Sequence, residues 1–315
     1  MIAEKKQAFS EQQTATALSK TYIDFFSGCG GLSLGLGMDQ WNGVFAIEKD
    51  KMAYSTFDHN LVDQASAHCH FKDWPEWLSR EAHSIEDVLE NQEILTHFEE
   101  LKGKVTLVAG GPPCQGFSVA GARNGNDPRN LLVFKMIHAI ELLKPLFCMV
   151  ENVGGFEKKF VQRPLDGATM SVAEEAVHEI EQLGYNVGKI TINAADYGVP
   201  QLRKRVIIFA ISKDFGGQLN VTRLLTDVLA QVKLEQRKEL GLPVDRYVNI
   251  EEAISDLAGT EMVDEPEFPK YRTCKYLPPV SAYQHSRLIP RLHHPQYHLS
   301  GYRPETGWRK RRSSW

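Results

Sequence analysis

Segments that resemble strands alternate with segments that resemble helices over the first two thirds of this 315-residue chain. The apolar, β-prone segments are residues 21–26, 43–48, 106–109, 147–150, 189–194 and 206–211. The segments with helical periodicity are residues 32–38, 51–59, 131–143, 172–183 and 221–240. Because such alternation is typical of βαβ units, we predict an α/β fold with a parallel sheet covered by helices on both faces.

The composition indicates an ordinary globular chain, with 42% hydrophobic and 24% charged residues. No run of eighteen apolar residues is present, and the first twenty residues are polar and lack the apolar centre of a signal peptide. The five cysteines are odd in number and irregular in spacing, which argues against a disulfide framework. We therefore expect a cytoplasmic protein with no membrane segment.

Positive charge gathers at the end of the chain, although the net charge is −4. Residues 281–315 hold seven Lys or Arg residues and a single acid, Glu305. A basic face of this kind could neutralise the phosphates of a nucleic acid. A solvated basic tail explains the same charges equally well.

A cysteine stands directly after the apolar run at residues 105–109, in the sequence Gly-Gly-Pro-Pro-Cys114-Gln-Gly-Phe-Ser. This places Cys114 on a stiff loop at the carboxyl end of a strand, where open α/β sheets bind their ligands. A thiol in that position could act as a nucleophile. The alternative is a tight turn that happens to contain a cysteine.

A glycine-rich turn, Ser27-Gly28-Cys29-Gly30-Gly31, follows the first strand-like segment. Glycines allow the backbone to approach a ligand closely, but such a turn alone suits a nicotinamide, a flavin, a methyl donor or simple packing. Glu48 ends the next strand-like segment, twenty residues after Gly28, where an acid can bind ribose hydroxyls. A solvated helix N-cap is the alternative for Glu48.

Four motifs occur in a fixed order: the turn that begins at Asp24, the Pro-Pro-Cys114 loop, Glu151-Asn152-Val153, and Gln-Leu-Arg203-Lys-Arg205. In this order they resemble the DNA (cytosine-5)-methyltransferase family. The resemblance covers residues 21–212, and residues 248–257 are similar to the segment that follows in the family. It implies a Rossmann-like sheet of the kind that binds S-adenosylmethionine.

The resemblance also implies roles for individual residues. Cys114 would add to carbon 6 of cytosine, so that carbon 5 becomes nucleophilic. Glu151 would contact N3 and the exocyclic amine, and Arg203 and Arg205, expected on one face of a strand, would hold the base, with Arg205 the favoured contact. The substrate would be double-stranded DNA with the target cytosine flipped out of the helix, and residues 118–128 would form a lid over it.

The methyl donor implied by the resemblance is S-adenosyl-L-methionine. The residues expected around it are Phe26, Gly28, Gly30, Glu48, Asp73, Trp74, Pro112 and Leu132. We predict no metal site, because the cluster His68-Cys69-His70 lacks a second pair of ligands.

We divide the chain into a polar extension (1–20), a catalytic and cofactor-binding domain (21–259), and a partial target-recognition region (260–315). Family members usually end in a Gly-Asn-x-Val-x-x-Pro segment, whereas this chain has no asparagine after Asn249. The leading hypothesis is DNA cytosine-5 methylation within a restriction-modification system. The alternatives are a truncated or split form that binds DNA or donor and needs a complementing second subunit, and an RNA cytosine-5 methyltransferase.

Overall fold

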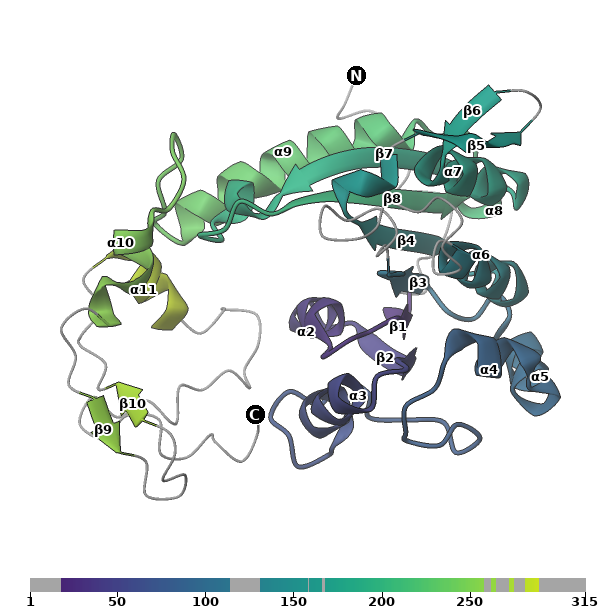
Figure 1. Cartoon of the computed structure of the whole chain (residues 1–315), viewed down its shortest axis with the longest axis horizontal. Coiled ribbons are helices and arrows are strands. Elements are labelled where there is room, and N and C mark those ends of the chain that lie inside the picture. The colour runs from purple at the N-terminus through teal and green to yellow at the C-terminus, as the bar shows by residue number, and fades with distance from the viewer. Residues whose placement is uncertain are drawn as a thin grey trace.

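A six-stranded sheet forms the centre of the computed structural model (Figure 1). The structure describes residues 18–113, 131–157, 159–165, 168–257, 262–264, 272–274 and 281–288. The strand order is β2-β1-β3-β4-β8-β7. These strands are β1 (Thr21–Phe25), β2 (Asn42–Ile47), β3 (Leu107–Gly110), β4 (Phe147–Asn152), β7 (Tyr185–Asn193) and β8 (Lys204–Ser212). All six lie within a few residues of the ranges predicted above.

Helices cover both faces of the sheet, as the alternating pattern predicts. The principal helices are α2 (Gly31–Met38), α3 (Lys51–Phe57), α4 (Ile85–Glu90), α5 (Gln92–Leu101), α6 (Leu132–Leu143), α7 (Val172–Gln182), α8 (Lys213–Gly216) and α9 (Val221–Glu239). Successive strand residues point to opposite faces, so Ile23 packs with helices α4 to α7 while Tyr22 packs with α2, α3 and the π-helical turn at Asp58–Val62. These two apolar layers pack against the sheet and form the core.

One part of the fold prediction is wrong, because the sheet is mixed and not fully parallel. Strands β2, β1, β3 and β4 are parallel, but β8 is antiparallel to both β4 and β7. Only residues 194–203 join β7 to β8, and they contain the short 3-10 turn η4 (Ala194–Tyr197). A parallel crossover needs a dozen or more residues, so this short connection folds as a hairpin.

Smaller elements follow the sheet or project from it. The hairpin β5 (Lys159–Leu165) and β6 (Ala168–Ser171) comes after the 3-10 turn η3 (Gly154–Glu157). Beyond α9 lie α10 (Ile250–Ile254), η5 (Ser255–Leu257), the strand pair β9 (Met262–Asp264) and β10 (Arg272–Cys274), and α11 (Ala282–Leu288). Leu242, Val248 and Ala253 form a separate small apolar cluster there, so this region has its own packing. None of the helices in the described ranges is long and apolar enough to span a membrane.

Candidate active site

Five chain segments meet at one edge of the sheet. Parallel strands β2, β1, β3 and β4 all end at this edge, so the turns after them lie side by side. Because β8 is antiparallel to β4, it begins where β4 ends. The mixed topology therefore explains how a motif at the start of β8 reaches motifs at the ends of the other strands.

The loop after β3 is fixed by its neighbours. A side chain at Gly110 has no room, since a Cβ there would lie 2.4 Å from the backbone oxygen of Phe25. At Gly111 a Cβ would approach Glu151 Oε2 to 3.2 Å. Asn152 Nδ2, which is buried, donates to the backbone oxygen of Pro112 over 3.1 Å. Glu151 and Asn152 thus lie against this loop at Gly111 and Pro112, and Pro112 is two residues before Cys114.

Glu151 and Arg205 form a close ion pair between β4 and β8. Arg205 Nε lies 2.6 Å from Glu151 Oε1, with 17% and 36% of the two side chains exposed. The cross-strand register places Glu151 opposite Ile207, two residues along β8 from Arg205. Arg205 Nη1 also donates to its neighbour's backbone oxygen, that of Lys204, over 2.8 Å. The structure therefore brings together the predicted acid and the favoured arginine.

Arg203 lies directly before the strand that carries Arg205. Strand β8 begins at Lys204, so Arg203 belongs to the preceding turn and its side chain is exposed. Its backbone N–H donates to Asn193 Oδ1 over 3.0 Å, which closes the connection between β7 and β8. Strand β8 thus carries Arg205 but not Arg203, and the predicted role of Arg203 stays a prediction. Of the two arginines, only Arg205 has a described contact with Glu151.

Glu48 organises the glycine turn after β1. Its Oε2 accepts a hydrogen bond from Gly28 N over 2.9 Å, and its Oε1 accepts one from Asp50 N over 2.7 Å. The N-cap of α3 is Asp50, whose side chain accepts from Met52 N and Ala53 N. The alternative reading of Glu48 as the N-cap is therefore wrong, and Glu48 instead joins the turns that follow β1 and β2.

The two predicted cofactor glycines occupy different environments. Both have positive φ, 55° at Gly28 and 92° at Gly30, which favours glycine at each position. Among the described residues, a Cβ at Gly28 would meet nothing within 4 Å, whereas at Gly30 it would collide with Leu61 and Phe57. Gly28 therefore borders open space, and Gly30 is needed for packing. Phe26, half-buried, also has a positive φ of 60°.

A buried carboxylate lies under the glycine turn. Asp24 is 1% exposed, its Oδ2 accepts from Ser33 Oγ over 2.6 Å, and its Oδ1 has no hydrogen-bond partner in the described part of the chain. Burial raises the pKa of Asp24 to about 7, the Ser33 hydrogen bond opposes this, and the nearby charge of Glu48 adds to it. Ser27 Oγ is likewise buried without a partner there.

The remaining predicted donor residues differ in exposure. Asp73 is exposed, while Trp74 is half-buried and its indole N–H donates to Leu78 O over 2.7 Å. Pro112 and Leu132 are buried, the latter at the first residue of α6. Cys114 and residues 118–128 lie outside the described residues, so their predicted roles stay predictions.

Comparison with known proteins identifies the family. The family model of the C-5 cytosine-specific DNA methylases matches residues 20–278. The chain belongs to this family. The Type II methyltransferase M.DdeI of Desulfomicrobium norvegicum is 32% identical over 256 residues, which are 79% of this chain and 52% of that protein. A crystal structure of a prophage-encoded E. coli protein described as a DNA modification methyltransferase is 25% identical, with a TM-score of 0.51, and the match covers 78% of this chain and 57% of that one.

This C-5 cytosine methylase chain spans about half the length of the first curated relatives it matches. M.AquIA of Picosynechococcus is different, because its 192 aligned residues are 61% of this chain but 71% of that protein, at 30% identity. M.AquIA is therefore shorter than this chain.

Two residues of the methylase site were not among the predicted site residues. Asn152 was quoted only as part of a motif, yet its amide holds the loop at Pro112. Its position directly after Glu151, at the end of a buried strand, was the available signal. Asp24 also begins a quoted motif, but its burial depends on α2 packing above it, which the local sequence does not reveal. Among the described residues, no three His, Cys, Asp or Glu side chains could hold a metal ion.

Proposed function

We propose that this chain transfers a methyl group from S-adenosylmethionine to carbon 5 of cytosine in DNA, with Cys114 as the nucleophile. The observation that carries the proposal is the Glu151–Arg205 pair beside the loop that leads to Cys114. A carboxyl and a guanidinium held together at 2.6 Å can address the polar edge of a pyrimidine through N3, the amine and O2.

The covalent step follows from the reactivity of cytosine. The Cys114 thiolate adds to carbon 6, and the ring electrons shift so that carbon 5 becomes nucleophilic. Carbon 5 would then take the methyl group, and the broken sulfur–methyl bond would leave the donor as a neutral thioether. Carbon 5 would lose its proton to a base as the bond to the Cys114 sulfur breaks and releases the thiolate. Glu151 would hold the ring through N3 during the addition, and Arg205 would keep Glu151 in place.

The residues beneath the glycine turn fit a cationic methyl donor. S-adenosylmethionine, when bound, supplies an activated methyl group on a positively charged sulfur. Asp24 Oδ1 and Ser27 Oγ are buried acceptors without partners in the described structure, and open space lies above Gly28. The residues that would hold the donor are Phe26, Gly28, Gly30, Glu48, Asp73, Trp74, Pro112 and Leu132.

The biological context remains part of the proposal. The relatives named above are Type II methyltransferases, which supports a role in a restriction-modification system with duplex DNA as substrate and a flipped cytosine. Because the chain spans half of several relatives, the second candidate is a form that needs a complementing polypeptide for turnover.

A covalent trap tests the proposal. The purified chain is incubated with donor and duplex DNA containing 5-fluorocytosine, which blocks release of the adduct. We expect a crosslinked species that Cys114→Ser abolishes, while Cys69→Ser retains it because Cys69 is buried away from the loop and bonds to Val62 O. An adduct with tRNA but not with DNA would instead establish the RNA activity. Adduct formation only after a second polypeptide is added would establish the split form, and no adduct under any condition would refute the chemistry.

A further inference from the structure

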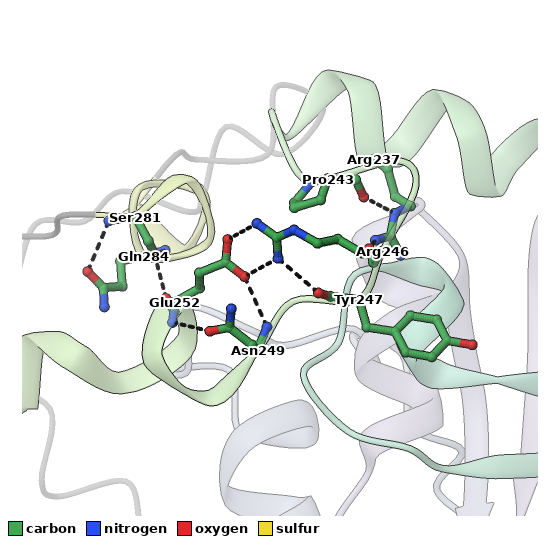
Figure 2. A network of polar contacts seen from close by, with 8 residues as sticks. All are labelled: Arg237, Pro243, Arg246, Tyr247, Asn249, Glu252, Ser281 and Gln284. Atoms are coloured by element: carbon green, nitrogen blue, oxygen red, sulfur yellow. Dashed lines mark hydrogen bonds and ion pairs between the residues drawn. The ribbon is translucent and has the colours of Figure 1, made fainter.

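A buried arginine, Arg237 near the end of α9, is bound entirely by backbone oxygens. It is 2% exposed, and its Nε donates to Pro243 O over 2.6 Å. Its Nη1 donates to Ala195 O over 2.9 Å and to Asp196 O over 3.1 Å, and its Nη2 donates to Arg246 O. Figure 2 shows the guanidinium beside Pro243 and Arg246. Four backbone acceptors from two separate segments thus converge on one side chain.

One of these segments is the turn η4, which comes before β8, the strand that carries Arg205. Asp196, within that turn, also pairs with Lys233 Nζ at 3.0 Å, and Tyr247 Oη lies 3.3 Å from the same carboxylate oxygen. Asn193 Oδ1 accepts from Ala195 N and Arg203 N and closes the other side of the connection. Side chains of α9 therefore hold the segment before Arg205 at Ala195 and Asp196.

The other segment leads into the second region. Arg246 pairs with both carboxylate oxygens of Glu252 at 2.7 and 2.8 Å, and Glu252 also forms a capping box with Asn249 at the start of α10 (Figure 2). Ser281 Oγ donates to Glu252 O, which joins α11 to α10. Arg237 thus stands between the strand that carries Arg205 and the helices that follow.

We propose that Arg237 is a positioning residue that sets the placement of the 194–205 segment and so holds Arg205 against Glu151. The backbone oxygens of Ala195, Asp196, Pro243 and Arg246 all accept from this one side chain, and only the planar, five-donor guanidinium reaches all four. A loss of these bonds frees both segments together. Displacement of a catalytic group by about 1 Å can lower a rate by about 100-fold, so the effect falls on turnover.

The test compares Arg237→Met and Arg237→Lys with Arg223→Met in the full-length chain. Arg223 lies on the same helix, is 82% exposed and pairs only loosely with Asp227 at 3.8 Å, so it controls for loss of one charge on α9. Arg237→Met is expected to lower adduct formation or methyl transfer by about 10- to 100-fold. Arg237→Lys keeps the charge but cannot reach four oxygens, so it recovers part of the rate. Donor affinity is expected to change by less than about twofold, because the glycine turn follows β1, which lies toward the opposite end of the strand order from β8 and β7.

Hydrogen exchange separates positioning from general loss of stability. We expect faster exchange at the amides of residues 194–203 in Arg237→Met, with protection kept in β1. Equal rates in Arg237→Met and wild type, or equally faster exchange in β1 and the 194–203 segment, would overturn the proposal. If Arg237→Met does not fold, the double variant Lys233→Met/Tyr247→Phe, which removes both side-chain contacts to Asp196, decides by the same comparison.

The inference rests on the proposed function for its activity readout only. A wild-type chain that forms no adduct would refute the proposed function, while the exchange comparison would still decide whether Arg237 holds the segment before Arg205.

Discussion

The buried carboxylate Asp24 makes the stability of the fold depend on pH. Its ordinary pKa of 3.8 rises to about 7 in the folded chain because burial disfavours the charged form. The folded state therefore holds a proton that the unfolded state has already released. The associated stability is fully present below pH 3.8 and is lost as the pH rises through about 7.

The size of the effect follows from the shift. A difference of about three pH units corresponds to about 4 kcal/mol in the free energy of unfolding once the pH exceeds both values. Between pH 5 and pH 8 the expected loss is about 2–3 kcal/mol. Asp24→Asn removes the titration while its amide oxygen can still accept from Ser33 Oγ, so this variant should lack that loss.

Urea denaturation of wild type and Asp24→Asn at several pH values between 5 and 8 measures this difference directly. Other groups titrate in both proteins, so the quantity of interest is the difference between the two curves. Asp39→Asn serves as a control, because Asp39 is 75% exposed and pairs with Lys20 at the surface, and it should leave the loss of stability in place. Parallel curves for wild type and Asp24→Asn would refute the reasoning.

Further substitutions test the loop that leads to Cys114. Asn152→Ala removes the donor to Pro112 O and should lower the free energy of unfolding by about 1–3 kcal/mol, as measured by denaturation. It should also lower adduct formation in the 5-fluorocytosine trap. Unchanged trapping would show that the loop does not need this bond. Gly110→Ala places a methyl group 2.4 Å from Phe25 O and should destabilise the chain by more than about 2 kcal/mol. Gly35→Ala, in α2 with open space around it, should instead stabilise by about 0.5–1 kcal/mol; thermal melts of the two variants in the same direction would contradict the packing argument.

The sequence predicted the strand segments because these depend on local patterns. Apolar runs followed by glycine or proline turns identify β1 and β3 wherever the chain finally places them. The direction of β8 was not predictable in the same way. Its apolar run reads alike in either direction, and only the length of the 194–203 connection determines that it returns as a hairpin.

The site shows the same division between local and long-range information. Glu151 and Arg205 were predicted individually, but their 2.6 Å contact depends on the antiparallel register of β4 and β8. Strand β8 begins at Lys204, so Arg203 precedes it by one residue, a boundary that the local pattern does not define. The bonds of Arg237 to Ala195 and Asp196 join residues more than forty positions apart along the chain, so no local pattern could reveal them.

The order of strands separates the two tasks proposed for the site, which are donor binding and presentation of the base. The glycine turn, Glu48 and Asp24 belong to β1 and β2 at one end of the sheet, whereas Arg205, α9 and the second region follow from β8 and β7 at the other (Figure 1). The side-chain hydrogen bonds described for Glu48 and Asp24 come from Gly28, Ser33 and Asp50, so they need nothing from the second region. Donor binding should therefore survive changes around Arg237 and α10, while presentation of the base to Glu151 should not. The boundary between these tasks runs between β3 and β4, where the Pro112 loop meets Asn152.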